Sequence, residues 1–176
     1  MIELVDVLVP AELDQNGILP RDVDGLDGIL WAPLLHAGWA HLIANSLPFV
    51  ILGWLVMSGG LRNFIGVTAI VWLVGGLGTW LFGASGAHVG ASGVVFGWMV
   101  FLLVRGFFQR SFGQILVAVV LFFYWGGMLW GVLPGQPGIS WEGHLFGAFG
   151  GLVAAWLVAK RTSRRPGPSS PGTLTM

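Results

Sequence analysis

The chain has 176 residues, of which 8 are Lys or Arg and 8 are Asp or Glu, so its formal net charge is zero. Charged residues make up 9% of the sequence, against about 25% in soluble domains, and hydrophobic residues make up 55%. So few ionisable groups cannot cover the surface of a soluble domain. A chain with zero net charge has little electrostatic attraction for nucleic acid. The absence of cysteine excludes disulfides and thiol nucleophiles. We therefore predict an all-α, polytopic transmembrane helical bundle that contacts the lipid bilayer and has no nucleic-acid partner.

The first 35 residues contain no apolar run long enough to cross a bilayer. Residues 1–9 are apolar but include Glu3 and Asp6, and a crossing helix needs about 20 apolar residues. Residues 10–35 are rich in Pro, Gly and Asp, which is typical of a loop at the membrane surface. No basic region precedes the first apolar run, so we expect no secretory signal peptide.

Five later segments are long and apolar enough to span a membrane: 40–57, 64–83, 92–109, 112–133 and 143–159. Each contains glycine, which membrane helices tolerate where a neighbouring helix packs against the backbone. We expect a membrane core at residues 36–159, preceded by an outer segment at 1–35. A basic tail at 160–176, rich in Pro, Ser and Gly, is predicted to be disordered.

The distribution of charge predicts the orientation. With five spans, seven of the eight basic residues fall on one side of the membrane, while Arg21 and all eight acidic residues fall on the other. The seven are Arg62, Arg105, Arg110, Lys160, Arg161, Arg164 and Arg165; the acids are Glu3, Asp6, Glu12, Asp14, Asp22, Asp24, Asp27 and Glu142. By the positive-inside rule the C-terminus is cytoplasmic, which we place at a bacterial plasma membrane.

The few polar side chains near the spans gather at one depth. His36, His41 and Asn45 lie at the outer entrance of the first span, Ser92 opens the third, and His144 opens the last. Burying such groups without partners costs several kcal/mol, so we expect them to share a polar cavity that faces outward.

Rows of glycine lie on the two spans that carry the serine and the histidine. Gly93 and Gly97 are four residues apart on one span, and Gly143, Gly147 and Gly151 are spaced in the same way on the other. Such rows let two membrane helices approach closely, which a serine and a histidine need to form a hydrogen bond.

This set of residues suits nucleophilic catalysis. The Ser92 hydroxyl is a weak nucleophile until an imidazole such as His144 accepts its proton. Asn45, His41 and the Ser92 amide are available donors for an oxyanion. Glu142 is two residues before His144 and points elsewhere on its helix, so we predict a Ser–His dyad and not a triad.

These motifs together resemble the rhomboid family of intramembrane serine proteases, over roughly residues 26–159. The resemblance lies in H-x4-H-x3-N, G-x-S-G and G-H-x-x-G-x-x-x-G, in this order, which here are His36, His41, Asn45, Gly90, Ser92, Gly93, Gly143, His144, Gly147 and Gly151. It implies a serine endopeptidase in which Ser92 is the nucleophile, His144 the general base, and His41, Asn45 and the Ser92 amide the oxyanion site. It also implies a transmembrane protein substrate and neither a metal nor an organic cofactor.

The chain departs from the family pattern in three places, one of them the Trp-Arg pair of the first outer loop, where Asp27 and Gly28 stand instead. The family core has six spans, so residues 1–9 are interpreted as the remnant of a truncated or missing first span. Phe96 stands where many bacterial members have a tyrosine that stacks on the catalytic imidazole, a change that keeps the ring and loses the hydroxyl.

Other interpretations remain open. A pseudoprotease of the same type would bind membrane clients without cleaving them, and a small transporter subunit is a more distant alternative. Taken alone, Ser92 is more typical of a helix cap. His144 alone is more typical of a contact with a lipid headgroup. His41 and Asn45 together are typical of an interhelical hydrogen bond. His88 is predicted to be a loop-surface residue.

Overall fold

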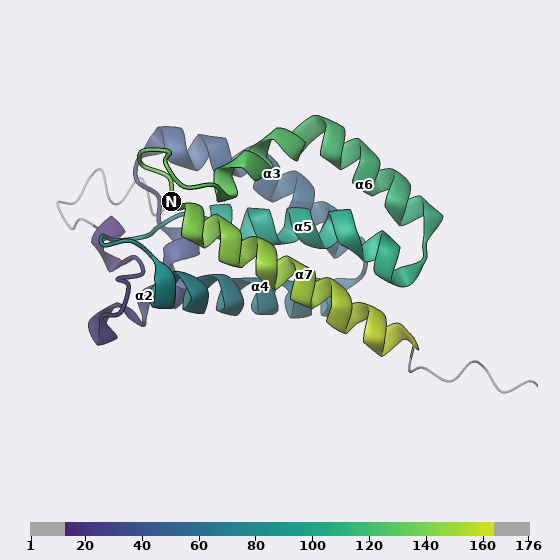
Figure 1. Cartoon of the computed structure of the whole chain (residues 1–176), viewed down its shortest axis with the longest axis horizontal. Coiled ribbons are helices and arrows are strands. Elements are labelled where there is room, and N and C mark those ends of the chain that lie inside the picture. Colours follow the sequence, from purple (N-terminus) through teal and green to yellow (C-terminus); the bar gives the residue numbers. More distant parts are fainter. Residues whose placement is uncertain (1–12, 164–176) are drawn as a thin grey trace, which may run out of the picture.

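The computed structural model describes residues 13–163 and shows five long apolar helices (Figure 1). They are α3 (Trp39–Met57), α4 (Leu61–Phe82), α5 (Ser92–Gln109), α6 (Phe112–Trp125) and α7 (Trp141–Ser163). A 3-10 helix, η4 (Gly126–Val132), continues α6 and completes the length of that span. The predicted all-α transmembrane bundle is confirmed, and each predicted span lies within a few residues of its helix.

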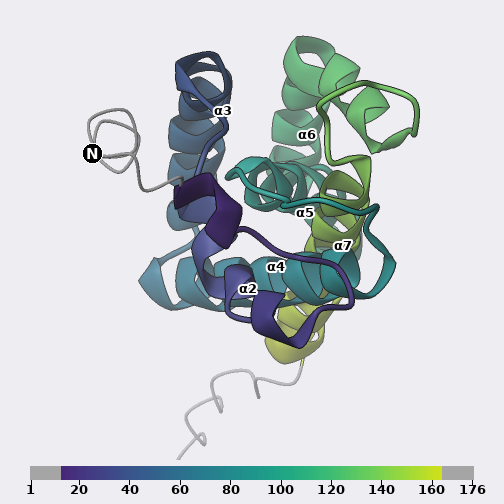
Figure 2. The same cartoon turned by 90° about the vertical axis from the view of Figure 1, so that its left-hand side faces the viewer.

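The segment before α3 is not a plain loop, so that prediction was wrong. It forms a chain of single turns: η1 (Leu13–Asn16), η2 (Val23–Gly25), α2 (Gly28–Trp31) and η3 (Ala32–Leu34). Ile18, Ile29 and Ala32 are buried together against Trp80 of α4. This segment therefore covers one end of the bundle (Figure 2). The predicted span remnant at residues 1–9 lies outside the described residues.

Helix α5 is the centre of the bundle, and the other four helices pack around it (Figures 1 and 2). Of its spanning window 56% is buried inside the protein, against 11% for α6, which packs mainly on α5 and presents most of its surface outward. The buried core includes Trp98, Met99 and Phe101 of α5, packed against Leu52 of α3 and Val71 of α4.

The glycine rows bring α5 and α7 into backbone contact, as predicted. A Cβ atom added at Gly147 would lie 2.1 Å from the carbonyl oxygen of Gly93, and one at Gly151 would lie 2.1 Å from that of Gly97. Contacts this short leave no room for any side chain. The relative position of the two helices is therefore fixed by backbone atoms, which cannot move aside as side chains can.

Helix α7 continues to Ser163, beyond the expected end of the last span. Residues 160–163 are helical, so their assignment to a disordered tail was wrong; residues 164–176 lie outside the described part of the chain. Lys160 and Arg161 lie in the last turn, where the negative end of the helix dipole favours cations.

We predict that Gly151→Ala destabilises the protein by about 1–3 kcal/mol, because the new methyl group overpacks against backbone atoms. Gly66→Ala on α4 is the matched control, since nothing lies within 4 Å of the corresponding Cβ position. Thermal unfolding in detergent, followed by tryptophan fluorescence, should show a lower Tm for the first variant only. Equal Tm values for the two variants would contradict the tight α5–α7 contact.

Candidate active site

A serine and a histidine from two neighbouring helices are joined by a hydrogen bond. Ser92 is the first residue of α5, and His144 lies in the first turn of α7. The Ser92 Oγ and His144 Nε2 atoms are 2.8 Å apart. This is within the range of 2.6–3.2 Å expected of a nucleophile and its base.

The second ring nitrogen of His144 fixes the tautomer of the imidazole. His144 Nδ1 lies 3.0 Å from the carbonyl oxygen of Gly131 in η4. A carbonyl oxygen can only accept a hydrogen bond, so a neutral imidazole carries its proton on Nδ1 and leaves Nε2 as the acceptor for the Ser92 hydroxyl. A backbone carbonyl thus orients the ring, as a carboxylate does in a Ser–His–Asp triad.

The face of the His144 ring is covered by Phe96, one turn after Ser92 on α5. The two rings are stacked, with centroids 4.0 Å apart and an interplanar angle of 9°. A Cβ atom at Gly131 would lie 2.9 Å from the Phe96 ring and 3.0 Å from His144 Nδ1. Glycine at position 131 therefore allows both the stack and the hydrogen bond to form.

The start of α5 supplies backbone donors beside the Ser92 hydroxyl. The first backbone hydrogen bond of this helix runs from Val95 N–H to Ala91 O, and no side chain caps its N-terminus. The first N–H groups of a helix have no partner within the helix, and they form the positive end of its dipole. The Ser92 amide is thus placed where negative charge is stabilised.

His41 and Asn45 approach the same region from α3. A Cβ atom at Gly90 would lie 2.6 Å from His41 Cε1 and 3.7 Å from Ser92 Oγ, so the imidazole and the hydroxyl flank one glycine. Gly90 has a φ of +117°, which favours glycine there for conformational reasons as well. Asn45 is buried, and its Nδ2 donates to the carbonyl oxygen of His41 at 3.1 Å, which leaves the second amide proton available.

His36 packs against the His41 ring. Its ring meets that of His41 edge to face, with centroids 5.2 Å apart, and its Nε2 is buried without a hydrogen-bond partner among the described residues. Burial, and secondly the charge of the neighbouring His41, lower the pKa of His36 below its usual value, so this imidazole is neutral at pH 7.

One open cavity of about 490 Å³ connects these groups. His41, Asn45, Ser92, Phe96 and His144 all line it, whereas His36 does not. The structure therefore brings the predicted polar residues of three helices together at one end of the bundle.

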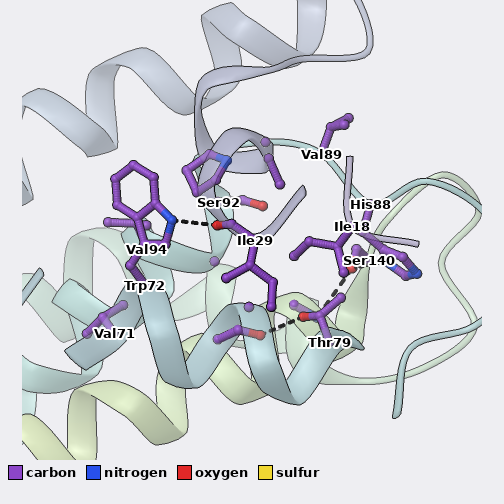
Figure 3. A pocket seen from close by; sticks show the side chains of 17 residues that line it. Ile18, Ile29, Val71, Trp72, Thr79, His88, Val89, Ser92, Val94 and Ser140 are labelled. Carbon is purple, nitrogen blue, oxygen red and sulfur yellow. Dashed lines mark hydrogen bonds between the residues drawn. The ribbon is translucent and has the colours of Figure 1, made fainter. Parts of the chain in front are cut away.

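A second, smaller cavity of about 50 Å³ also borders Ser92 (Figure 3). Thr79, His88, Ser92 and Ser140 contribute polar side chains to its wall. The volume exceeds the roughly 10–15 Å³ that one water molecule requires, but the wall of this cavity is mostly apolar. Ser92 thus borders both cavities.

The α4–α5 loop (residues 83–91) is clasped to the start of α7 by two side-chain contacts. His88 Nδ1 lies 2.6 Å from Ser140 Oγ, and the Ala84 N–H donates to Glu142 Oε1 at 2.9 Å. His88 is half-buried and bonded, so its prediction as a loop-surface residue was wrong. Glu142 is buried and points to this loop, away from His144 as expected.

Sequence reasoning missed three contributors to the site: Gly131, Ser140 and the clasping role of His88. Every residue has a backbone carbonyl, so the sequence does not indicate which one accepts the hydrogen bond from His144. Gly131 is also one of several glycines after α6 and does not stand out among them. The position of Ser140 directly before the last helix was a usable signal, because serine there typically caps a helix; its Oγ accepts from the Gly143 N–H at 3.3 Å.

Comparisons with known proteins point to one family. The family model for the Rhomboid domain matches residues 26–161. An uncharacterized Mycobacterium tuberculosis protein is 49% identical over 90% of this chain and 70% of its own length, and one from Mycobacterium leprae is 46% identical over 97% and 73%. YdcA of Bacillus subtilis, whose name assigns it to the rhomboid proteases, is 31% identical over 75% of this chain and 67% of its own length. No solved structure matches the chain significantly.

We predict that Glu142→Ala loosens the α4–α5 loop, because the Ala84 amide loses its acceptor at a cost of about 1–3 kcal/mol. Glu142→Gln is the matched control, since its amide oxygen still accepts. Hydrogen exchange of residues 83–91 should be faster in the alanine variant and near the wild-type rate in the glutamine variant. Unchanged exchange in Glu142→Ala would show that the clasp does not hold the loop.

Proposed function

The chain belongs to the rhomboid family, and from this premise we propose that it is an intramembrane serine endopeptidase. The observation that carries the proposal is the hydrogen bond of 2.8 Å between the Ser92 hydroxyl and His144 Nε2, the ring nitrogen that the contact with Gly131 leaves unprotonated. A helix-capping role for Ser92 would not explain why its hydroxyl is bonded to an imidazole whose tautomer is fixed by a second hydrogen bond.

In the proposed first step, His144 Nε2 removes the hydroxyl proton of Ser92 while the oxygen attacks the scissile carbonyl carbon. The imidazolium that forms keeps its Nδ1–H bonded to the Gly131 carbonyl, whose partial negative charge stabilises it. The stacked Phe96 ring holds the imidazole in the plane required for this transfer and adds attraction for the cation.

The oxyanion of the tetrahedral intermediate would be bound by the Ser92 amide, His41 and Asn45. These donors line the same cavity and come from two helices, so they are in position before the reaction begins. Donors fixed in this way have no reorganisation to undergo when charge develops. Collapse of the intermediate passes the proton from His144 to the leaving amine and leaves an acyl-enzyme on Ser92.

Water must then reach the acyl group at membrane depth. The open cavity of about 490 Å³ beside Ser92 gives water a path to it, and His144 accepts a proton from the attacking water as it did from the serine. The substrate would be a transmembrane protein whose helix unwinds near its outer end, because a helical backbone shields the carbonyl that must be attacked. By the distribution of basic residues, the site faces the outside of a bacterial plasma membrane.

We predict that a fluorophosphonate probe labels the wild-type protein and that Ser92→Ala abolishes labelling. Ser85→Ala is the matched control, because Ser85 is an exposed serine that lines the same cavity. Absence of labelling in a folded wild-type protein would favour a pseudoprotease, and labelling that persists in Ser92→Ala would identify another nucleophile.

We also predict that Asn45→Ala lowers kcat on a model transmembrane substrate by about 10²–10³-fold, the usual effect of removing one oxyanion donor, with a small change in KM. Ser46→Ala is the control, since Ser46 is exposed and bonds only to Leu42 of its own helix. A large rise in KM with constant kcat would assign Asn45 to substrate binding instead.

A further inference from the structure

A second large cavity is lined by residues near the end of α5 and the start of α6. These parts of the two helices lie at the opposite end of the bundle from Ser92 (Figure 1). Its volume is about 760 Å³, and it is lined by residues of α4, α5, α6 and α7. The polar residues of its wall are Arg62, Asn63, Arg105, Gln109, Gln114, Arg161 and Thr162. Three of these seven carry a positive charge, which gives this cavity a character unlike that of the active-site cavity.

Arg105 is the innermost of the three arginines. It is 9% exposed, and its Nε is buried without a hydrogen-bond partner among the described residues. Its recorded contact is with the ring of Phe101, 5.6 Å from the guanidinium carbon. A guanidinium offers five donors in a fixed fork, and burying them unpaired is costly. An acceptor that enters the cavity would satisfy the buried Nε–H of Arg105.

At this end, no anionic side chain comes from the part of the chain that the structure describes. The acidic residues of the sequence belong to positions 1–27 or to position 142, and residues 143–176 contain none. Asp22, Asp24, Asp27 and Glu142 lie in segments at the other end of the bundle. The buried Gln114 Oε1 also lacks a partner within residues 13–163, while Gln114 Nε2 donates to Gln109 Oε1 at 3.1 Å. The cavity thus combines arginine donors with a free amide acceptor, which suits a ligand that carries both an anion and hydroxyl groups.

Two helix starts add to the positive potential. Gly59, Arg62 and Asn63 of the cavity wall lie at the beginning of α4, and Gln114 lies in the first turn of α6. No side chain caps either helix. The unpaired N–H groups and the positive dipole ends of both helices therefore favour an anion on this side.

We propose that this arginine cavity binds a phosphate-bearing anion, and that its natural source is the headgroup of an anionic phospholipid. Arg105 would bind the phosphate oxygens in a bidentate manner, with Arg62 and Arg161 closing over it from the rim. In the orientation given by the basic residues the cavity opens at the cytoplasmic leaflet, where anionic lipids reside. The proposal does not depend on the proteolytic activity.

The test is thermal unfolding of the full chain in dodecyl maltoside micelles, followed by the fluorescence of its tryptophans. Phosphatidylglycerol should raise the Tm in a saturable manner, and phosphatidylcholine should not. For Arg105→Gln we expect the concentration that gives half the shift to rise about tenfold or more, because hydrogen bonds to charged groups carry at least that factor in affinity. Arg110→Gln is the matched control, since Arg110 is exposed near the same end and does not line the cavity.

Two further arms make the result decisive. The double variant Arg62→Gln/Arg161→Gln changes only exposed residues, so it folds even if Arg105→Gln does not, and it should also weaken the response. Inorganic phosphate in place of lipid separates the sources: a shift that depends on Arg105 with phosphate alone, and no further shift with phosphatidylglycerol, would overturn the lipid assignment. Equal responses of the wild-type protein and both sets of variants, or no response to any anion, would overturn the site.

Discussion

Backbone contact between α5 and α7 is the constraint on which the candidate site depends. Side chains at positions 93, 97, 147 and 151 would hold the two helices apart, because carbonyl oxygens already occupy the space next to each Cα. Ser92 and His144 lie at the outer ends of these same glycine rows, so the packing that joins the helices also sets the distance between hydroxyl and imidazole. In lipid, where apolar surface gives little preference for one helix partner over another, such steric fit is the main source of specificity.

A second constraint is that polar groups at this depth must be satisfied within the protein. The bonds of His144 to Gly131, of Glu142 to Ala84 and of His88 to Ser140 tie η4 and the α4–α5 loop to the start of α7. Each contact joins a loop or a short 3-10 helix to the start of α7 or to the residue directly before it. The end of the bundle that carries the site is therefore held by a network of side-chain bonds, whereas the interior is held by packing.

The sequence predicts the spans well because the length of an apolar run is a direct physical requirement of the bilayer. It also predicts the meeting of His41, Asn45, Ser92 and His144, since glycine spacing and depth are both visible in the residues. The acceptor for His144 was not predictable, because a main-chain carbonyl at Gly131 depends on how η4 folds back toward α7. The helical turn at 160–163 was missed because polar residues continue a helix beyond the apolar span when the preceding turns are already formed.

Helix α5 links the two polar cavities, since Ser92 stands at one end and Arg105 near the other. At 1.5 Å per residue these two side chains are separated by about 20 Å of helix axis. The helix between them is the most buried of the five and packs on all the others, so an anion bound at Arg105 would stabilise the element that positions the nucleophile. Over this distance a single charge is not expected to alter the chemistry of Ser92 directly, because no chain of ionisable groups among the described residues connects the ends. The physical effect of the arginine cavity is thus on the stability of the bundle, and the properties of the Ser92–His144 pair are set locally.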